Sequence, residues 1–172
     1  TFGARIDHNN ASLASAAAFD GYGVILFVAL ETSREVAVVD AHNHAEFFRI
    51  NVGRAPQGLA VSPDGTRLYV HNFMDRTVGV YDISRVTTEG QWDAPLVTTL
   101  QSVATEPLSA TVLKGKQLFY DARDARLARE GYMSCASCHN DGGGDGRVWD
   151  LTGMGEGLRN TTSLRGRGGA QG

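Results

Sequence analysis

The sequence predicts an α+β protein in two parts: an antiparallel β-sheet built from repeats, followed by a smaller, mostly α-helical part. Three observations support this prediction. A strand-rich pattern recurs with a period of 42 residues between residues 15 and 83. Beyond Pro107 the apolar residues follow a helical period instead of a period of two. A Cys-x-x-Cys-His motif then occupies residues 135–139. We place the two parts at residues 1–103 and 104–172.

The composition excludes several classes of partner. With 42% hydrophobic and 20% charged residues, the 172-residue chain is typical of a soluble globular protein. A net charge of −3 gives no reason to expect nucleic acid or an anionic membrane as a partner. The longest apolar stretch, residues 24–30, has the length of a strand and is far too short to span a membrane.

The repeat aligns residues 15–41 with residues 57–83 without a gap. Each copy predicts alternating strands separated by turns, with Pro63 and Gly65 at favoured turn positions. Residues 46–52 supply a further strand, whose counterpart in the second copy is displaced by about eight inserted residues. The predicted strands of the second copy are residues 59–61, 68–70, 78–81 and 95–101. Residues 1–14 are predicted as a loop, and residues 84–107 as a linker containing one strand.

Four short strands in about 42 residues is the size of one propeller blade. Residues 55–72 resemble the YVTN family of β-propeller repeats, and Tyr-Val-His-Asn at residues 69–72 differs at one position from the tetrapeptide that names the family. The resemblance implies a sheet of one to two propeller-like blades. Two units cannot close a ring of four to eight blades. We therefore expect the sheet edges to be covered by the C-terminal part, by another chain or by further sequence.

The apolar stripe beyond Pro107 predicts a helix. Proline is common in the first turn of a helix, and Ser109 is the expected N-cap. The residues of the stripe are Leu108, Val112, Gly115, Phe119 and Ala122. We expect Gly115, which has no side chain, to allow close approach of a neighbouring element.

The Cys-x-x-Cys-His motif is the attachment signature of c-type haem. Residues three apart lie on one side of a helical turn, so the thiols of Cys135 and Cys138 can both reach the edge of a porphyrin. His139 is then the proximal iron ligand. One covalent haem c is therefore predicted. Both cysteines of the chain are used in this way, and because covalent attachment normally takes place outside the cytoplasm, we expect a periplasmic or extracellular protein.

Two alternatives to haem remain open for this motif. A redox dithiol of the thioredoxin type would lie in a βαβ pattern, which does not surround it. A structural zinc site needs four ligands, and the chain has no third cysteine. The alternative function is thus a β-repeat binding module whose Cys-x-x-Cys-His binds a metal or acts as a dithiol. His42 and His44 are a second candidate metal pair, although solvent-exposed turn histidines are the commoner outcome.

From about residue 108 onward the chain resembles the bacterial di-haem cytochrome c peroxidase family. The residues that carry the resemblance are 115–120, the haem motif, 145–147 and 159–161. The resemblance implies a cytochrome c-like domain that transfers one electron at a time, in a protein that fuses a propeller to a haem domain. It also implies a second haem domain, absent from this chain, or another redox partner. With one attachment motif, this chain alone is not expected to turn over peroxide.

Further residues near the motif are candidates for contact with the haem. Met154 is a possible distal iron ligand, with a ligand from outside the chain, water or an open position as alternatives. Four arginines, Arg147, Arg159, Arg165 and Arg167, are available to bind the haem propionates, and Arg147 is the favoured one. A solvated surface position is the alternative for each. Trp149 is expected either to pack against the porphyrin edge or to fill the core. The Gly-rich residues 141–146 lack the ligands of a calcium loop and predict a tight turn. The terminal residues 165–172 are predicted to be mobile.

Overall fold

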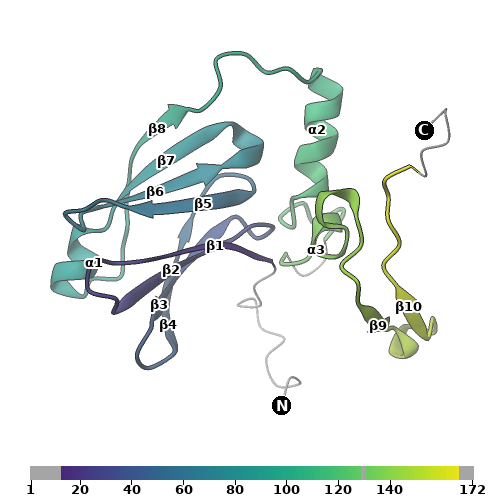
Figure 1. The fold of residues 1–172 in the computed structure, drawn as a ribbon, viewed down its shortest axis with the longest axis horizontal. Helices are drawn as coiled ribbons and strands as arrows, with labels where there is room; N and C mark the ends of the chain where they lie inside the picture. The colour runs from purple at the N-terminus through teal and green to yellow at the C-terminus, as the bar shows by residue number, and fades with distance from the viewer. Residues whose placement is uncertain (1–12, 129–130, 167–172) are drawn as a thin grey trace.

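The computed structural model describes residues 13–128 and 131–166. Most of the predicted N-terminal loop and of the predicted mobile tail lies outside these residues. Figure 1 shows two four-stranded sheets packed face to face, with the C-terminal part beside one end of the pair. No helix within the described ranges is long and apolar enough to cross a membrane.

Each copy of the repeat forms one antiparallel sheet, in which the strands follow chain order. The first sheet consists of β1 (Ala14–Phe19), β2 (Ile25–Leu30), β3 (Glu35–Asp40) and β4 (Ala45–Asn51). The second consists of β5 (Pro56–Val61), β6 (Arg67–Asn72), β7 (Thr77–Asp82) and β8 (Leu96–Gln101). Consecutive pairing of four antiparallel strands is the arrangement of a propeller blade. The strands predicted from the repeat are confirmed.

The two sheets also share their irregularities. The register shifts between Ala14 and Ala16 in the first sheet and between Pro56 and Gly58 in the second. These positions are related by the 42-residue period, and so are the shifts between the third and fourth strands. A β-bulge adds a residue to one strand and increases its twist. The positions of the bulges therefore recur with the same 42-residue period as the strands themselves.

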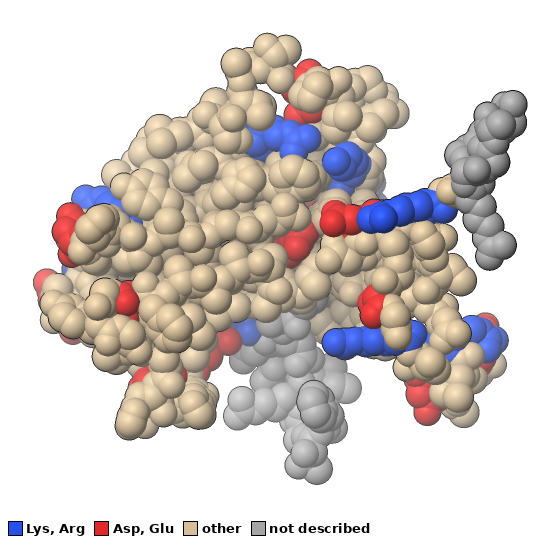
Figure 2. All heavy atoms as spheres, in the orientation of Figure 1, with Lys and Arg blue, Asp and Glu red and all other residues tan. Residues whose placement is uncertain are grey.

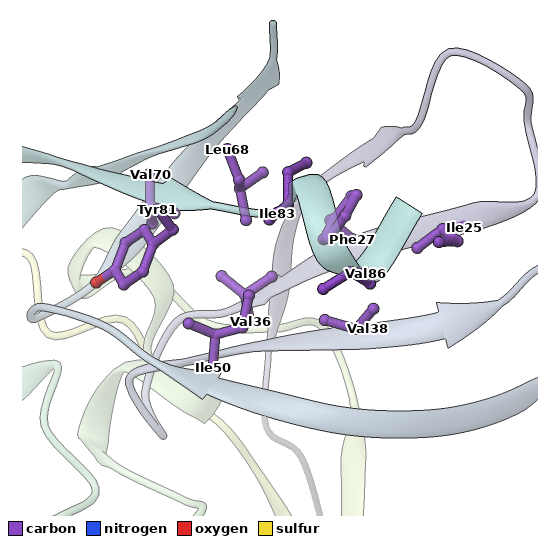
Figure 3. Packing of buried hydrophobic residues seen from close by; sticks show 10 residues of the cluster. All are labelled: Ile25, Phe27, Val36, Val38, Ile50, Leu68, Val70, Tyr81, Ile83 and Val86. Carbon is purple, nitrogen blue, oxygen red and sulfur yellow. The ribbon is translucent and has the colours of Figure 1, made fainter. Parts of the chain in front are cut away.

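The core lies between the two sheets (Figure 3). β-Branched and aromatic side chains alternate along the strands, so one face of each sheet is apolar and turns toward the other. The buried residues are Ile25, Phe27, Val36, Val38, Ile50, Leu68, Val70, Tyr81, Ile83 and Val86. Burial of this set provides most of the free energy that holds the sheets together.

The residues inserted in the second repeat contain an element that the sequence did not predict. Residues 84–95 were expected to be a linker, but α1 (Ser84–Glu89) forms there and buries Val86 in the core. The ring of Trp92 then stacks on Phe47 of β4, with ring centroids 4.2 Å apart. The insertion is ordered because it covers one end of the core, and these contacts depend on tertiary structure alone.

The C-terminal part is less helical than predicted. Its helical elements are α2 (Ala110–Phe119), α3 (Cys135–Cys138) and the 3-10 turns η2 (Asn140–Gly142) and η3 (Thr152–Met154). Its strands are the short pair β9 (Val148–Asp150) and β10 (Leu158–Asn160). A further 3-10 turn, η1 (Phe73–Asp75), lies between β6 and β7 of the second sheet. The N-cap is confirmed, because Ser109 Oγ accepts a bond from the Val112 amide. Glycines with positive φ interrupt the chain after α3, so a cytochrome-like α-domain is not shown.

The predicted role of Gly115 in close packing is wrong. Nothing lies within 4 Å of a side chain built at this position, and the middle of α2 is exposed. The helix instead packs through its C-terminal end, where Phe119 and the buried Tyr120 contact Met74 and Ala55 of the second repeat. The predicted apolar stripe is therefore in contact with the rest of the protein only at the C-terminal end of the helix.

Two arginines at equivalent positions of the repeat attach the C-terminal part to the sheets. Arg34, in the β2–β3 turn, forms two bonds to the Asp121 carboxylate, one of them from Nε at 2.9 Å. Arg76, 42 residues later in the β6–β7 turn, pairs with Glu106 through Nε at 2.8 Å. Both arginines have positive φ, at 56° and 57°. The same turn position thus serves as an anchor in both sheets.

We expect Asp121→Ala to destabilise the protein more than any surface charge change in this region. The Asp121 side chain is 6% exposed and that of Arg34 is 20% exposed. Removing one partner leaves the other charge largely buried and unpaired, at a cost of roughly 3 kcal/mol. Urea unfolding should detect this loss. Glu89→Ala is the control, because Glu89 and its partner Arg85 are both more than half exposed and the change should alter stability little. Equal effects of the two variants would contradict this account.

Candidate functional site

The Cys-x-x-Cys-His motif forms a single helical turn, α3. Cys135 is exposed, Cys138 is partly exposed, and neither forms a disulfide. The Ser134 amide donates to Ser137 Oγ at 3.0 Å, which stabilises the start of the turn. Ala136 is fully buried in a cluster with residues of the second repeat and α2. Burial of Ala136 between the two cysteines therefore fixes the turn and leaves both thiols at least partly accessible.

His139 ends this turn with its ring held by the backbone. Its amide donates to the Cys135 carbonyl at 2.9 Å. Its ring Nδ1 lies 3.2 Å from the carbonyl oxygen of Gly143. Because a carbonyl can only accept, Nδ1 carries the proton in the neutral ring and the lone pair resides on Nε2. A backbone acceptor at the second ring nitrogen is the usual arrangement behind a metal-binding histidine.

The Gly-rich segment after His139 forms the predicted tight turn. Asp141 and Gly142 have φ values of 50° and 75°, so the chain reverses immediately after the motif. A side chain at Gly144 would lie 2.5 Å from the carbonyl oxygen of Thr161, so only glycine allows this approach. The hydroxyl of the buried Tyr120 donates to Asp141 at 2.7 Å. The turn is therefore held from both sides, and it presents the Gly143 carbonyl to His139.

Two hollows flank the motif. A hollow of about 300 Å³ is lined by Cys138 and His139 together with a further set of mostly apolar or small polar residues. That set is Met133, Trp149, Leu151, Arg159, Asn160, Thr161 and Thr162. A larger hollow of about 580 Å³ shares Met133 and Trp149 with the first, and Arg147 contributes to its wall. Volumes of this size are those of small-molecule and cofactor sites.

Trp149 lines both hollows and is held by Asp145. Its indole Nε1 donates to Asp145 Oδ2 at 2.9 Å. The other carboxylate oxygen of Asp145 accepts from the Arg147 amide at 3.0 Å. This backbone bond, with further bonds from Trp149 and Thr161, lowers the pKa of Asp145. Trp149 thus has a fixed position beside the motif, with its ring in the walls of both hollows.

The arginines predicted to contact the haem lie in different surroundings. Arg147 is exposed and lines the larger hollow. Arg159 lines the hollow that contains His139, because β10 pairs with β9 and places it opposite Trp149. Arg165 donates to the Asp141 carbonyl instead. From the sequence, Arg159 was one of four equivalent candidate cations. Its place beside His139 depends on the pairing of β9 with β10, which the sequence analysis did not predict. The backbone of Met154 lies in η3, and its side chain is outside the described part.

The surroundings of Cys138 do not favour the thiolate form of its side chain. Burial, and then the charges of Asp145 and Cys135, raise the pKa of the Cys138 thiol. Redox-active dithiols depend on the opposite shift. Among the residues that the structure describes, no group of three His, Cys, Asp or Glu side chains could hold a metal ion. His42 and His44 are exposed in the β3–β4 turn.

A buried carboxylate lies behind the motif. Glu31, at the end of β2, is almost fully buried and accepts a bond from Gln57 Nε2 at 2.9 Å. Burial raises its pKa, the bond from Gln57 opposes this, and the charge of Asp141 raises it further. Glu31 and Asp141 line one polar hollow with Gln57 and Asn140. The ionised form of Glu31 is thus disfavoured in the folded protein.

We expect Glu31→Gln to make the protein more stable than the wild type at neutral pH. The pKa of Glu31 is higher in the folded protein than in the unfolded chain. The contribution of Glu31 to the stability of the wild type is therefore largest below its unfolded-state pKa, and it is lost as pH rises through its folded-state pKa. The two proteins should therefore be equally stable near pH 4 and diverge as pH rises, since the amide does not ionise. Urea unfolding at a series of pH values measures this. Glu89→Gln, on the exposed surface of α1, is the control, and a constant difference at every pH would contradict the assignment.

Comparisons with known proteins show no family for this chain. No protein-family model matches the chain, and no curated protein sequence matches it. Among solved structures, hydrazine synthase of Kuenenia stuttgartiensis shares 24% identity, over 58% of this chain and 26% of that one, with a TM-score of 0.46. The β-propeller domain of Myceliophteria thermophila Cps50 (Swd1) shares 16% identity, over 52% and 29%, with a TM-score of 0.48. The periplasmic gluconolactonase PpgL of Pseudomonas aeruginosa shares 22%, over 51% and 25%, with a TM-score of 0.43. The chain thus spans less than a third of each of these proteins.

Proposed function

We propose that this protein binds one haem c covalently and takes part in one-electron transfer. The observation that carries the proposal is the state of His139, whose Nδ1 is held by the Gly143 carbonyl while two free thiols lie on the preceding turn. Cys135 and Cys138 would form the thioether bonds, and His139 Nε2 would be the proximal iron ligand. A bound haem supplies an iron couple that accepts and releases one electron.

The residues around His139 support a haem rather than a bare metal ion. The hollow beside Cys138 and His139 is mostly apolar, as the face of a porphyrin requires. Trp149, fixed by Asp145, is the aromatic side chain that would pack against the ring. Arg159 and Arg147 are the cations available to the propionates, and Arg159 shares the hollow with His139. A dithiol would leave the orientation of His139 without an explanation, and the described residues include no group of three His, Cys, Asp or Glu side chains that could hold a zinc ion.

The wider setting follows from the same proposal. Covalent attachment implies maturation in the periplasm or outside the cell. The resemblance to di-haem cytochrome c peroxidases suggests that the electron passes to or from a second haem domain outside this chain, or to another redox protein. The distal iron ligand in this proposal is Met154, a group from that partner, or water. The chain by itself is not proposed to turn over peroxide.

Expression together with the haem-attachment machinery tests the proposal. The expected product is red, stains for haem on a denaturing gel, and gives the alkaline pyridine spectrum of haem c. His139→Gln should change the absorption spectrum of any haem that is attached, because the iron loses its proximal ligand. His42→Gln, in an exposed turn, is the control and should leave the spectrum unchanged. A colourless product from cells that mature another c-type cytochrome would overturn the proposal.

A further inference from the structure

The second sheet has an apolar outer face that is partly exposed in the described structure. One face packs on the first sheet, and the opposite face carries Tyr69, Val78, Val80 and Leu100. Tyr69 is 37% exposed and Leu100 is 52% exposed, whereas Val78 is partly exposed and Val80 is 7% exposed. Figure 2 shows few charged side chains over β5 to β8, in the upper left of the view. We call these four residues the open face.

The open face repeats the surface with which the first sheet covers the second. Phe27, Val36 and Val38 of the first sheet lie 42 residues before Tyr69, Val78 and Val80. Ile50 pairs with Val36 in the first sheet as Leu100 pairs with Val78 in the second. Phe27, Val36, Val38 and Ile50 are all buried in the core between the sheets. The open face is therefore a second copy of a surface that is already known to pack on a sheet of this kind.

The same chain also carries the complementary surface. The first sheet packs on Leu59, Val61, Leu68 and Val70 of the second. Their equivalents in the first sheet lie on its outer face and are apolar as well. These equivalents are Ala17, Phe19, Leu26 and Val28. Phe19 is 56% exposed. We call these four residues the receiving face.

We propose that the open face of one molecule docks on the receiving face of a second copy of this chain. The contact between the two sheets within one chain is its template, and the proposal does not depend on haem. Because the two faces differ, the association is head-to-tail. Charged residues lie at the margins: Arg67 replaces Ile25 on the open face and pairs with Asp82 at 2.9 Å, and Arg49 pairs with Glu35 beside the receiving face. A polar rim around an apolar centre is usual for a protein interface.

Sedimentation of the purified chain over a wide range of concentration tests the proposal. The average mass of the wild type should rise with concentration. Tyr69→Lys places a charge in the open face, and Phe19→Lys places one in the receiving face. Each variant alone should therefore fail to associate. Each variant keeps one intact face, so a mixture of the two should form one-to-one dimers that grow no further. Tyr22→Lys, in the exposed β1–β2 turn, is the matched control and should associate like the wild type.

Two outcomes would overturn the proposal. One is a wild-type chain that stays monomeric at every concentration up to its solubility limit. The other is a mixture of Tyr69→Lys and Phe19→Lys that stays monomeric while the wild type associates, because a head-to-tail contact needs only one intact face from each partner. Both substitutions are at exposed positions, and circular dichroism of each variant verifies that the fold is retained.

Discussion

A chain in which serine replaces both Cys135 and Cys138 is expected to carry no covalent haem after passage through the haem-attachment pathway. The thiols lie on one turn of α3, and each can form one thioether bond. With both sulfurs gone, any haem that enters the hollow beside His139 is held only by the iron–imidazole bond and by packing. Denaturation should then release all of the haem, and a stained denaturing gel measures this loss.

The single variants separate the two sulfurs. Cys135→Ser or Cys138→Ser alone should leave one thioether bond, so the stain persists but the pyridine spectrum shifts toward longer wavelength because one vinyl group remains unsaturated. Retention of the stain in the double variant would show that another group holds the haem and would contradict the assignment. Far-UV circular dichroism checks that the variants keep their β-sheets.

Phe27→Ala should reduce the free energy of unfolding by about 3–5 kcal/mol, the usual cost of truncating a buried phenylalanine. The Phe27 side chain is fully buried at the centre of the contact between the two sheets (Figure 3). Its removal leaves a cavity that the paired strands on either side cannot close. Urea unfolding of the variant and the wild type gives the difference.

Phe19→Ala provides the matched comparison for this effect. Phe19 belongs to the same sheet, but it lies on the outer face and is 56% exposed. Measured at low protein concentration, its loss should change stability by no more than about 0.5 kcal/mol, as for most surface substitutions. A similar loss for both variants would mean that the first sheet is not packed on the second as described.

The repeat made the sheets predictable. The two copies align without a gap at an offset of 42 residues, so a strand recognised in one copy predicts the same strand in the other. Val36 in β3 and Val78 in β7 are one such pair. Turn chemistry at Pro63 and Gly65 marked the boundary between β5 and β6. The insertion in the second copy had no counterpart from which to predict it. Its helix depends on burial of Val86 and stacking of Trp92, which only the folded sheets make possible.

The candidate site was predictable in its motif and less so in its surroundings. The spacing of Cys135, Cys138 and His139 indicated one helical turn, which the structure contains. The carbonyl partner of His139 was not predictable, because it depends on the turn formed by Gly142 and its neighbours. The mostly helical character expected of the C-terminal part was wrong for the described residues. α2 ends at Phe119, and beyond it glycines with positive φ form turns where the resemblance had implied a mostly helical domain.

Intact-mass spectrometry of the matured protein under denaturing conditions tests the central claim most directly. We predict a chain heavier by the mass of one haem, with the added mass on the proteolytic peptide that contains Cys135 and His139. A chain of unmodified mass, obtained from cells that attach haem to a control cytochrome c, would contradict the account.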